Sequence, residues 1–340
     1  MTPITYTRES INDLHPRDVV LVGDVEYTIE RNIRGGMGLV LLATKSPSTS
    51  VRIKYSSLGG RVALKAPLVG DSPNTEMAVF KRELTIWAGF RQNNIVPLLD
   101  VLHGEDGNFL AAMDWHAGSL RDLIREKHQF SLSESLHIIK CMLSGLFYAN
   151  EKDKVLHLDI KPENVLYRRS SFGDMADSKH KGEVMKYVFM VSDWGIASVK
   201  SASLSSILER RPTASLENTY NNMGTIHYMA PERFRTGTPS SIASDIYSLG
   251  MVFYELLTGS LPISQNAILA YQVREITSLV YYQSAQSKMC NCDIPIEYVR
   301  VILSMIHPEP EKRPISYHEL YNTLITAGRK ANNLFKRIFK

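Results

Sequence analysis

An acid, a base and an amide share one short stretch of the chain, His157-Leu158-Asp159-Ile160-Lys161-Pro162-Glu163-Asn164. A carboxylate such as Asp159 can accept the proton of a hydroxyl group. Lys161 can steady a phosphoryl group in transfer, and the amide of Asn164 can bind Mg²⁺. A polar loop without chemistry is the alternative interpretation, but the order and spacing of the three side chains favour phosphoryl transfer.

Two stretches nearer the N-terminus have residue types that can hold phosphate. Glycines cluster in Arg34-Gly35-Gly36-Met37-Gly38, where backbone N–H groups can approach phosphate oxygens. Lys65 ends the apolar stretch Val62–Lys65, and Glu83 is a candidate partner because a buried lysine is costly unless paired. An ordinary tight turn and a lysine that reaches water are the alternatives.

Two stretches beyond residue 190 complete the candidates. Asp193 follows an apolar run in Val191-Ser192-Asp193-Trp194-Gly195 and is a candidate second Mg²⁺ ligand. Asp-Trp-Gly alone is a common turn, so the weight of Asp193 comes from its position after Asn164. The stretch Gly224-Thr225-Ile226-His227-Tyr228-Met229-Ala230-Pro231-Glu232 follows further along.

Apolar periodicity predicts the elements that position these residues. Strands are expected at Tyr27–Asn32, Met37–Ala43, Arg61–Pro67, Ile95–Leu102 and Phe109–Trp115, with an amphipathic helix over 75–91. After Gly118, helices are expected at Leu132–Asn150, Ser241–Thr258, Ala267–Leu279 and Ile296–Ile306. Ser131 or Ser133 is expected to cap the first of these. An irregular arm is expected over 1–24, and polar stretches over 45–60, 168–183 and 198–222.

Composition limits the class of protein. The 340 residues carry a net charge of +4, too small to favour nucleic acid as a partner. No signal peptide is visible, and no run reaches the roughly 18 apolar residues of a membrane helix. The three cysteines suit neither a disulfide framework nor a zinc site, so a cytoplasmic protein with reduced thiols is expected. Residues 329–340 are basic; a solvated, frayed tail is favoured over contact with an acidic partner or lipid.

In their order and spacing, these motifs resemble those of the eukaryotic-type (Hanks-type) Ser/Thr protein kinases. The resemblance covers residues 25–325, and its most specific parts are His157–Leu166 and Gly224–Glu232. The implied fold is α+β and bilobal, with a small β-rich N-lobe containing one helix and a larger, mainly helical C-lobe. The lobes would span 25–113 and 119–325, joined by a hinge at 114–118 and flanked by an arm at 1–24 and a basic tail at 326–340. The Gly-Gly-Met-Gly sequence is more similar to bacterial members than to animal ones.

The resemblance also implies a role for each candidate residue. Lys65, paired with Glu83, would bind the phosphates of ATP, and Asp159 would be the catalytic base, with Lys161 beside it. Asn164 and Asp193 would hold Mg²⁺, with Mn²⁺ as a substitute. The other nucleotide contacts would come from Ile33, Gly35, Gly36, Gly38, Val40, Ala63, Met113, Asp114, His116 and Leu166. Asp245 would brace the catalytic loop, and Glu232 would pair with Arg313.

Residue types at two positions indicate the class of substrate. In the family, a lysine two residues after the catalytic aspartate marks Ser/Thr kinases, and Lys161 fits this pattern. Gly224-Thr225 fits the same class. The expected substrates are therefore proteins with Ser or Thr acceptors, and the chain itself is an expected substrate through the hydroxyl-rich segment between Ser198 and Thr219.

Three positions depart from the family pattern. Ile33 stands where the first glycine of the Gly-rich loop is usual. Leu158 replaces an arginine that normally meets a phosphate on the activation loop, so activity is expected not to depend on that switch. Trp194 replaces a phenylalanine and is expected to pack with His157, Trp87 and Leu98.

Three other functions are alternatives to an active protein kinase. A pseudokinase scaffold is supported by the three departures, but the phosphoryl-transfer residues are all present: Lys65, Glu83, Asp159, Lys161, Asn164 and Asp193. A small-molecule kinase would lack the Ala-Pro-Glu region at its usual place. A P-loop NTPase is excluded because G-x-x-x-x-G-K-[ST] does not occur.

Overall fold

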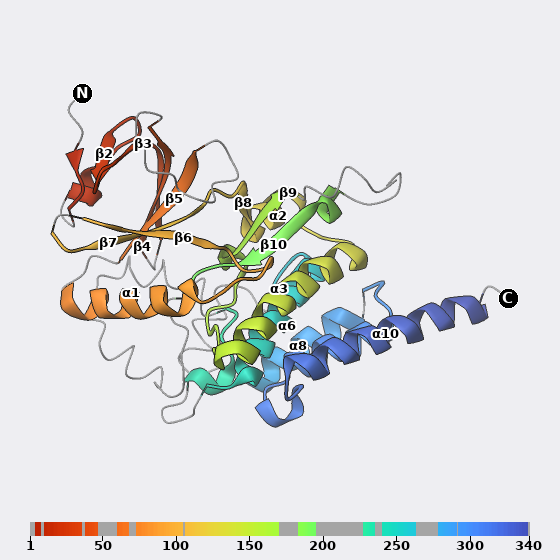
Figure 1. Cartoon of the computed structure of the whole chain (residues 1–340). Helices are drawn as coiled ribbons and strands as arrows, with labels where there is room; N and C mark the ends of the chain where they lie inside the picture. Colours follow the sequence, from red (N-terminus) through yellow and green to blue (C-terminus); the bar gives the residue numbers. More distant parts are fainter. Residues whose placement is uncertain are drawn as a thin grey trace. The chain divides into compact units, whose positions relative to one another are not determined.

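The computed structural model describes residues 4–7, 10–35, 38–46, 60–67, 73–104, 106–169, 183–194, 227–234, 240–262, 278–290 and 292–338. The chain divides into two compact units, residues 1–117 (the N-unit) and 118–340 (the C-unit) (Figure 1). The N-unit contains a large β-sheet and one described α-helix, and the C-unit is mainly helical. The expected α+β fold class is confirmed.

The N-unit is built on a single sheet whose described strands run in the order β1-β2-β3-β4-β5-β7-β6. Neighbouring strands are antiparallel except β1 and β2, which pair in parallel. The strands are β1 Ile4–Thr5, β2 Val19–Val22, β3 Val25–Gly35, β4 Gly38–Lys45, β5 Arg61–Ala66, β6 Leu98–His103 and β7 Phe109–Asp114. The helix α1 spans Pro73–Ala88 and lies along one side of this sheet (Figure 1).

Register fixes which residues of the central strands are neighbours. Val40 on β4 lies opposite Lys65 on β5, and Lys65 lies opposite Ala111 on β7. Ala63 on β5 likewise lies opposite Met113. Since side chains alternate between the faces of a strand, Ala63 and Lys65 share one face of β5.

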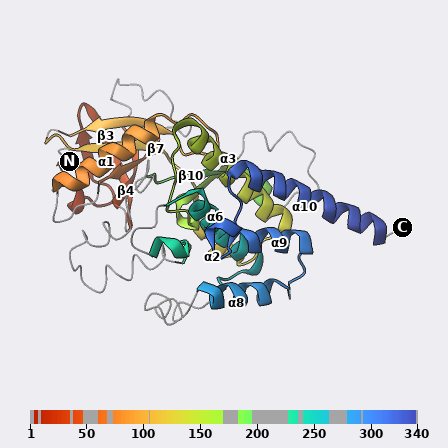
Figure 2. The ribbon, with the colours of Figure 1, turned by 90° about the horizontal axis from the view of Figure 1, so that it is seen from below.

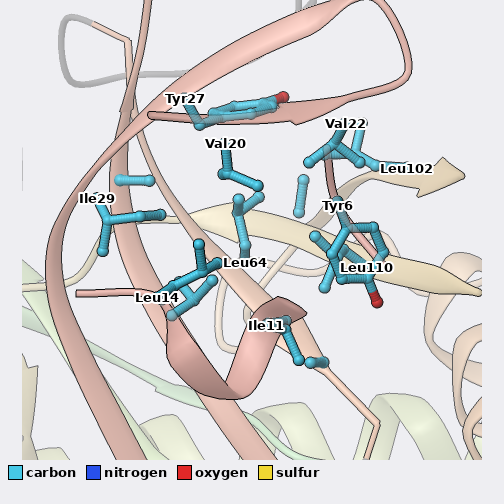
Figure 3. Packing of buried hydrophobic residues seen from close by; sticks show 14 of the residues in the cluster. Tyr6, Ile11, Leu14, Val20, Val22, Tyr27, Ile29, Leu64, Leu102 and Leu110 are labelled. Atoms are coloured by element: carbon cyan, nitrogen blue, oxygen red, sulfur yellow. The ribbon is translucent and has the colours of Figure 1, made fainter. Parts of the chain in front are cut away.

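The expectation of an irregular arm over residues 1–24 is wrong for the described residues. They contribute β1, the 3₁₀ helix η1 (Ser10–Asp13) and β2 to the N-unit. Tyr6, Ile11 and Leu14 are each about 1% exposed and belong to the same hydrophobic cluster as Leu64 and Leu110. Figure 3 shows these side chains directed toward one another. Burial of scattered apolar side chains overrides the weak local signal of this polar stretch.

The C-unit consists of helices together with a small sheet of order β10-β9-β8. Its strands are β8 Gly118–Ser119, β9 Val165–Arg169 and β10 Tyr187–Val191. Its described α-helices are α2 Leu120–Lys127, α3 Leu132–Asp153, α6 Ile242–Thr258, α8 Ser278–Cys290, α9 Ile296–Met305 and α10 Tyr317–Ile338. Short 3₁₀ helices are η2 Pro162–Asn164, η3 Glu183–Lys186, η4 Pro231–Phe234 and η5 Pro310–Lys312.

The helix α6 forms the centre of the C-unit. All its residues from Ser244 to Leu257 are buried, and it packs against both α3 and α9 (Figure 2). A helix that is buried all round needs apolar residues on every side, which this segment has. Gly259 ends it with a left-handed backbone (φ 72°), a conformation that glycine adopts without a steric penalty.

Local capping also explains where α3 begins. Ser131 accepts a hydrogen bond from the Glu134 backbone N–H, and the Glu134 carboxylate accepts one from the Ser131 N–H in return. This reciprocal box satisfies donors that the first turn of a helix leaves unpaired. Ser131, and not Ser133, is therefore the N-cap residue.

Several boundaries differ from the sequence-based expectation. The expected strand Ile95–Leu102 begins only at Leu98, and the expected frayed tail is helical through Ile338, within α10. In Figures 1 and 2 the end of α10 extends away from the other helices of the C-unit. Most of the expected helix Ala267–Leu279, and most of the three polar stretches, lie outside the described residues. Within the described part of the chain, no helix is both long and apolar enough to cross a membrane.

Candidate active site

A buried carboxylate on α6 holds the backbone of the segment around Asp159. Asp245 is 0% exposed and accepts hydrogen bonds from the backbone N–H groups of His157 and Leu158, both at 2.8 Å. The Tyr317 hydroxyl donates a further bond to it at 2.8 Å. The expected bracing role of Asp245 is confirmed. A carboxylate that accepts several bonds fixes its donors in one arrangement.

The backbone at this site is strained at two positions. Leu158 and Asp193 both have φ of 64°, in the left-handed region that side chains with a β-carbon disfavour by about 1–2 kcal/mol. Such conformations persist where the surrounding contacts enforce them, and they concentrate at functional sites. Here one strained residue, Leu158, directly precedes Asp159, and the other is Asp193 itself.

The carboxylate of Asp159 has one oxygen held and one available. Its Oδ2 lies 2.8 Å from Lys161 Nζ and accepts a 2.7 Å bond from Asn164 Nδ2. Its Oδ1 is buried and has no hydrogen-bond partner among the described residues. A buried acceptor without a donor is costly, so it fits a place where a substrate group donates.

Burial raises the pKa of Asp159 above its ordinary value. The adjacent Lys161 opposes this shift, while the negative charge of Asp193 adds to it. A raised pKa makes the carboxylate a better proton acceptor than an exposed aspartate, as general base catalysis requires.

Asn164 and the segment before Asp193 are joined by hydrogen bonds. Ser192 donates both its backbone N–H and its hydroxyl to the Asn164 carbonyl oxygen, at 2.9 and 3.0 Å. Within the described ranges no group of three or more His, Cys, Asp or Glu side chains is arranged to hold a metal. An amide and one carboxylate suit Mg²⁺, which usually takes one or two protein ligands together with substrate phosphates and water.

In the N-unit the candidate lysine and glutamate form an ion pair. Lys65 on β5 and Glu83 on α1 lie 2.6 Å apart, and their side chains are 6% and 4% exposed. The alternative of a lysine that reaches water is therefore wrong. Buried pairs contribute little net stability because both charges are desolvated, so such a pair favours a functional explanation.

The candidate nucleotide contacts fall on described elements with one exception. Gly35 and Gly38 end β3 and begin β4, Gly36 lies outside the described residues, and Ile33 is 41% exposed. Ala63 and Met113 are buried neighbours, while Val40 and Asp114 are half-buried. His116 Nδ1 lies 2.7 Å from the Asp114 carbonyl oxygen. Leu166, on β9, is half-buried in the C-unit.

Trp194 packs against His157 within the C-unit. Their ring centroids are 4.7 Å apart and Trp194 is 1% exposed. His157 Nε2 also lies 3.0 Å from the Ser192 carbonyl oxygen, so the histidine connects both strained segments. Trp87 and Leu98 belong to the N-unit, and their contact with Trp194 stays a prediction.

The ion pair expected between Glu232 and Arg313 is confirmed. Arg313 Nη1 and Nη2 each lie 2.9 Å from a different Glu232 oxygen, and both residues are buried. The Ser244 hydroxyl donates to Glu232 Oε1 at 2.8 Å. The two-point pair joins η4 to Arg313, which directly follows η5, and the Ser244 bond joins η4 to the start of α6.

Two further residues at the site, Arg121 and Arg233, were not identified from the sequence. Arg121 on α2 contacts Glu163 at 2.7 Å, Glu255 at 2.8 Å and the Tyr228 hydroxyl. Burial lowers the pKa of Arg121, but Tyr228 and the two carboxylates outweigh this and raise it above the ordinary value. Arg233 on η4 donates to the Leu158 carbonyl oxygen. These contacts join residues that are 42 to 134 positions apart in the sequence, so no local sequence pattern predicts them.

A family model of the protein kinase domain matches residues 42–324, most of the chain. The chain belongs to the protein kinase family. Among its relatives are two probable serine/threonine-protein kinases, one from Clostridium acetobutylicum (28% identical over 247 residues, 72% of this chain) and one from Clostridium perfringens (26% over 269 residues, 77%). The serine/threonine-protein kinase PrkC of Bacillus subtilis is 26% identical over 235 residues, 69% of this chain.

All three relatives are bacterial and are named as Ser/Thr kinases, which agrees with the bacterial resemblance of the Gly-Gly-Met-Gly sequence. The alignments cover 32%, 34% and 31% of the respective relatives, so this kinase matches about one third of their length.

Proposed function

We propose that this kinase transfers the γ-phosphoryl group of ATP to Ser or Thr hydroxyls of proteins, with Asp159 as the catalytic base. The observation that carries the proposal is the different environment of the two oxygens of the Asp159 carboxylate. Lys161 and Asn164 hold Oδ2, while the buried Oδ1 has no donor among the described residues. A substrate hydroxyl is a donor of the right kind for that oxygen.

The proposed step moves one proton and one phosphoryl group. The hydroxyl gives its proton to Asp159 as its oxygen bonds to the γ-phosphorus, and the bond from that phosphorus to the bridging oxygen breaks to leave ADP. Lys161, 2.8 Å from Asp159, offers positive charge to the group in transfer. Catalysis of this kind depends on positioning and charge, which a buried and braced loop supplies.

The remaining candidates take binding roles in this proposal. Magnesium-bound ATP supplies the reactive phosphate, and Asn164 and Asp193 offer the protein oxygens for the metal. Lys65 offers its charge to the phosphates, with Glu83 holding it in place. The named residues of β3, β4, β5 and β7, with Asp114, His116 and Leu166, bind the rest of the nucleotide.

Labelling with γ-³²P-ATP and Mg²⁺ tests this function. The kinase, alone and with a generic basic protein, is expected to yield phosphoserine or phosphothreonine after acid hydrolysis. Label on the kinase itself would support autophosphorylation. Chelation of the metal with EDTA is expected to remove the signal, since the transfer needs the metal. Nucleotide binding without any label on either protein would instead support a scaffold.

We also propose that activity does not depend on phosphorylation of the kinase. Leu158 is buried and apolar and offers no charge to a phosphate. Phosphatase treatment, checked by intact mass, is expected to leave at least about half of the activity, since a phosphate switch needs a cation to receive it. A loss of more than about tenfold would contradict this proposal.

A further inference from the structure

Arg233 is a buried cation next to the catalytic loop of the C-unit. It is the second-last residue of η4, directly after Glu232, and is 6% exposed. Burial lowers the pKa of Arg233, but a guanidinium keeps its charge in a protein. A charge in such a place needs acceptors or opposite charges around it.

The hydrogen bond of Arg233 reaches the strained residue of the loop. Its Nη1 donates to the carbonyl oxygen of Leu158, whose N–H donates to Asp245 Oδ1 at 2.8 Å. Both peptide groups of Leu158 are therefore held, one by a cation and one by an anion. The peptide group whose carbonyl Arg233 holds is the one that leads directly into Asp159.

The charges around Arg233 also favour a role at the catalytic loop. The carboxylates that favour the charged form of Arg233 are first Asp245 and then Asp159, with Glu232 third. Glu232 already has the two-point pair with Arg313 and a bond from Ser244. The charge of Arg233 thus chiefly offsets the two acids of the catalytic loop region.

The sequence shows why such a cation matters here. Position 158, which carries an arginine in the family pattern, is a leucine in this kinase. We propose that Arg233 is a positioning residue that supplies a permanent positive charge to the catalytic loop and holds the Leu158–Asp159 peptide in place. This inference rests on the proposed role of Asp159, and it makes the arrangement of the loop independent of an added phosphate.

Hydrogen exchange measured by mass spectrometry tests the proposal without relying on activity. In Arg233→Met, amides of the segment 157–160 are expected to exchange at least about tenfold faster, because the Leu158 carbonyl loses its partner. If the methionine variant does not fold, Arg233→Gln tests the charge separately, because glutamine keeps a donor but loses the positive charge, and its segment 157–160 is still expected to exchange faster than in the wild type. Arg233→Lys is expected to lie closer to the wild type. Arg300→Met, on the exposed face of α9, is the matched control and should leave the segment unchanged.

Kinetics supply the second readout. A positioning role predicts a kcat reduced by at least about tenfold in Arg233→Met, with the KM for ATP within about twofold of the wild type. Unchanged exchange at 157–160, or equal acceleration across the whole C-unit, overturns the proposal. A lysine variant no better than glutamine overturns the role of the charge. An inactive wild type would defeat the proposed function, while the exchange result would still decide the role of Arg233.

Discussion

Replacing Asp159 with asparagine is expected to lower kcat by about 10²–10⁴-fold, the usual contribution of a general base. The amide has nearly the same shape but cannot take the proton of a substrate hydroxyl. Since Asp159 is proposed to act on the acceptor and not on the nucleotide, affinity for ATP should change little. Steady-state kinetics and nucleotide titration measure the two quantities separately.

The pH dependence of the same reaction gives an independent check. The base works when it is ionised, and burial raises the pKa of Asp159. The wild-type kcat should therefore begin to fall on acidification at a higher pH than an ordinary aspartate would give.

Asp153→Asn, at the exposed end of α3, is the matched control for the Asp159→Asn substitution and should keep full activity. An Asp159→Asn variant with more than about one tenth of wild-type kcat would be incompatible with a general base.

Replacing Arg313 with methionine is expected to lower the free energy of unfolding of the C-unit by about 3–5 kcal/mol. The change leaves the Glu232 carboxylate buried without its cation, since Arg313 provides both of its 2.9 Å contacts. It also removes hydrogen bonds to the carbonyl oxygens of His307, Ala243 and Pro308. Denaturant unfolding followed by circular dichroism measures the loss.

Two comparisons make the Arg313 result specific. Lys312→Met removes a neighbouring charge with an exposed side chain and should leave the unfolding midpoint unchanged. Adding Glu232→Leu to Arg313→Met removes the unpaired carboxylate, so the double variant should be more stable than the single one. A loss below about 1 kcal/mol in Arg313→Met would mean that the pair behaves like an exposed one.

Local pattern predicted the parts of the fold whose apolar residues recur regularly. The strands from Val25 to Lys45, the helix α1 and the buried helix α6 follow from such periodicity. The N-terminal elements escaped because Tyr6, Ile11 and Leu14 stand at irregular intervals in a polar stretch. Only their shared burial, a tertiary effect, reveals their role. The helical end of α10 escaped because its charges suggested a solvated tail.

The candidate site also has residues that the sequence predicted and residues that it did not. Asp159, Lys161 and Asn164 lie within six residues, so their order alone predicted a phosphoryl-transfer loop. Glu83 was a reasonable partner for Lys65 because a lysine in an apolar strand needs one. Arg121 and Arg233 reach the site from distant segments, through contacts that depend on the packing of the C-unit. A single sequence carries no signal for contacts of that range.

The N-terminal part of the sheet has a consequence for synthesis on the ribosome. Tyr6, Ile11 and Leu14 share a core with Leu102 and Leu110. At the usual speed of translation, roughly 5–20 seconds separate the first residues from partners about a hundred positions later. During that interval β1 to β5 already have neighbouring strands to pair with, but β6 and β7 have not yet been made. The start of the chain must therefore wait for β7, and the N-unit completes its core as a whole rather than from its first residue onward.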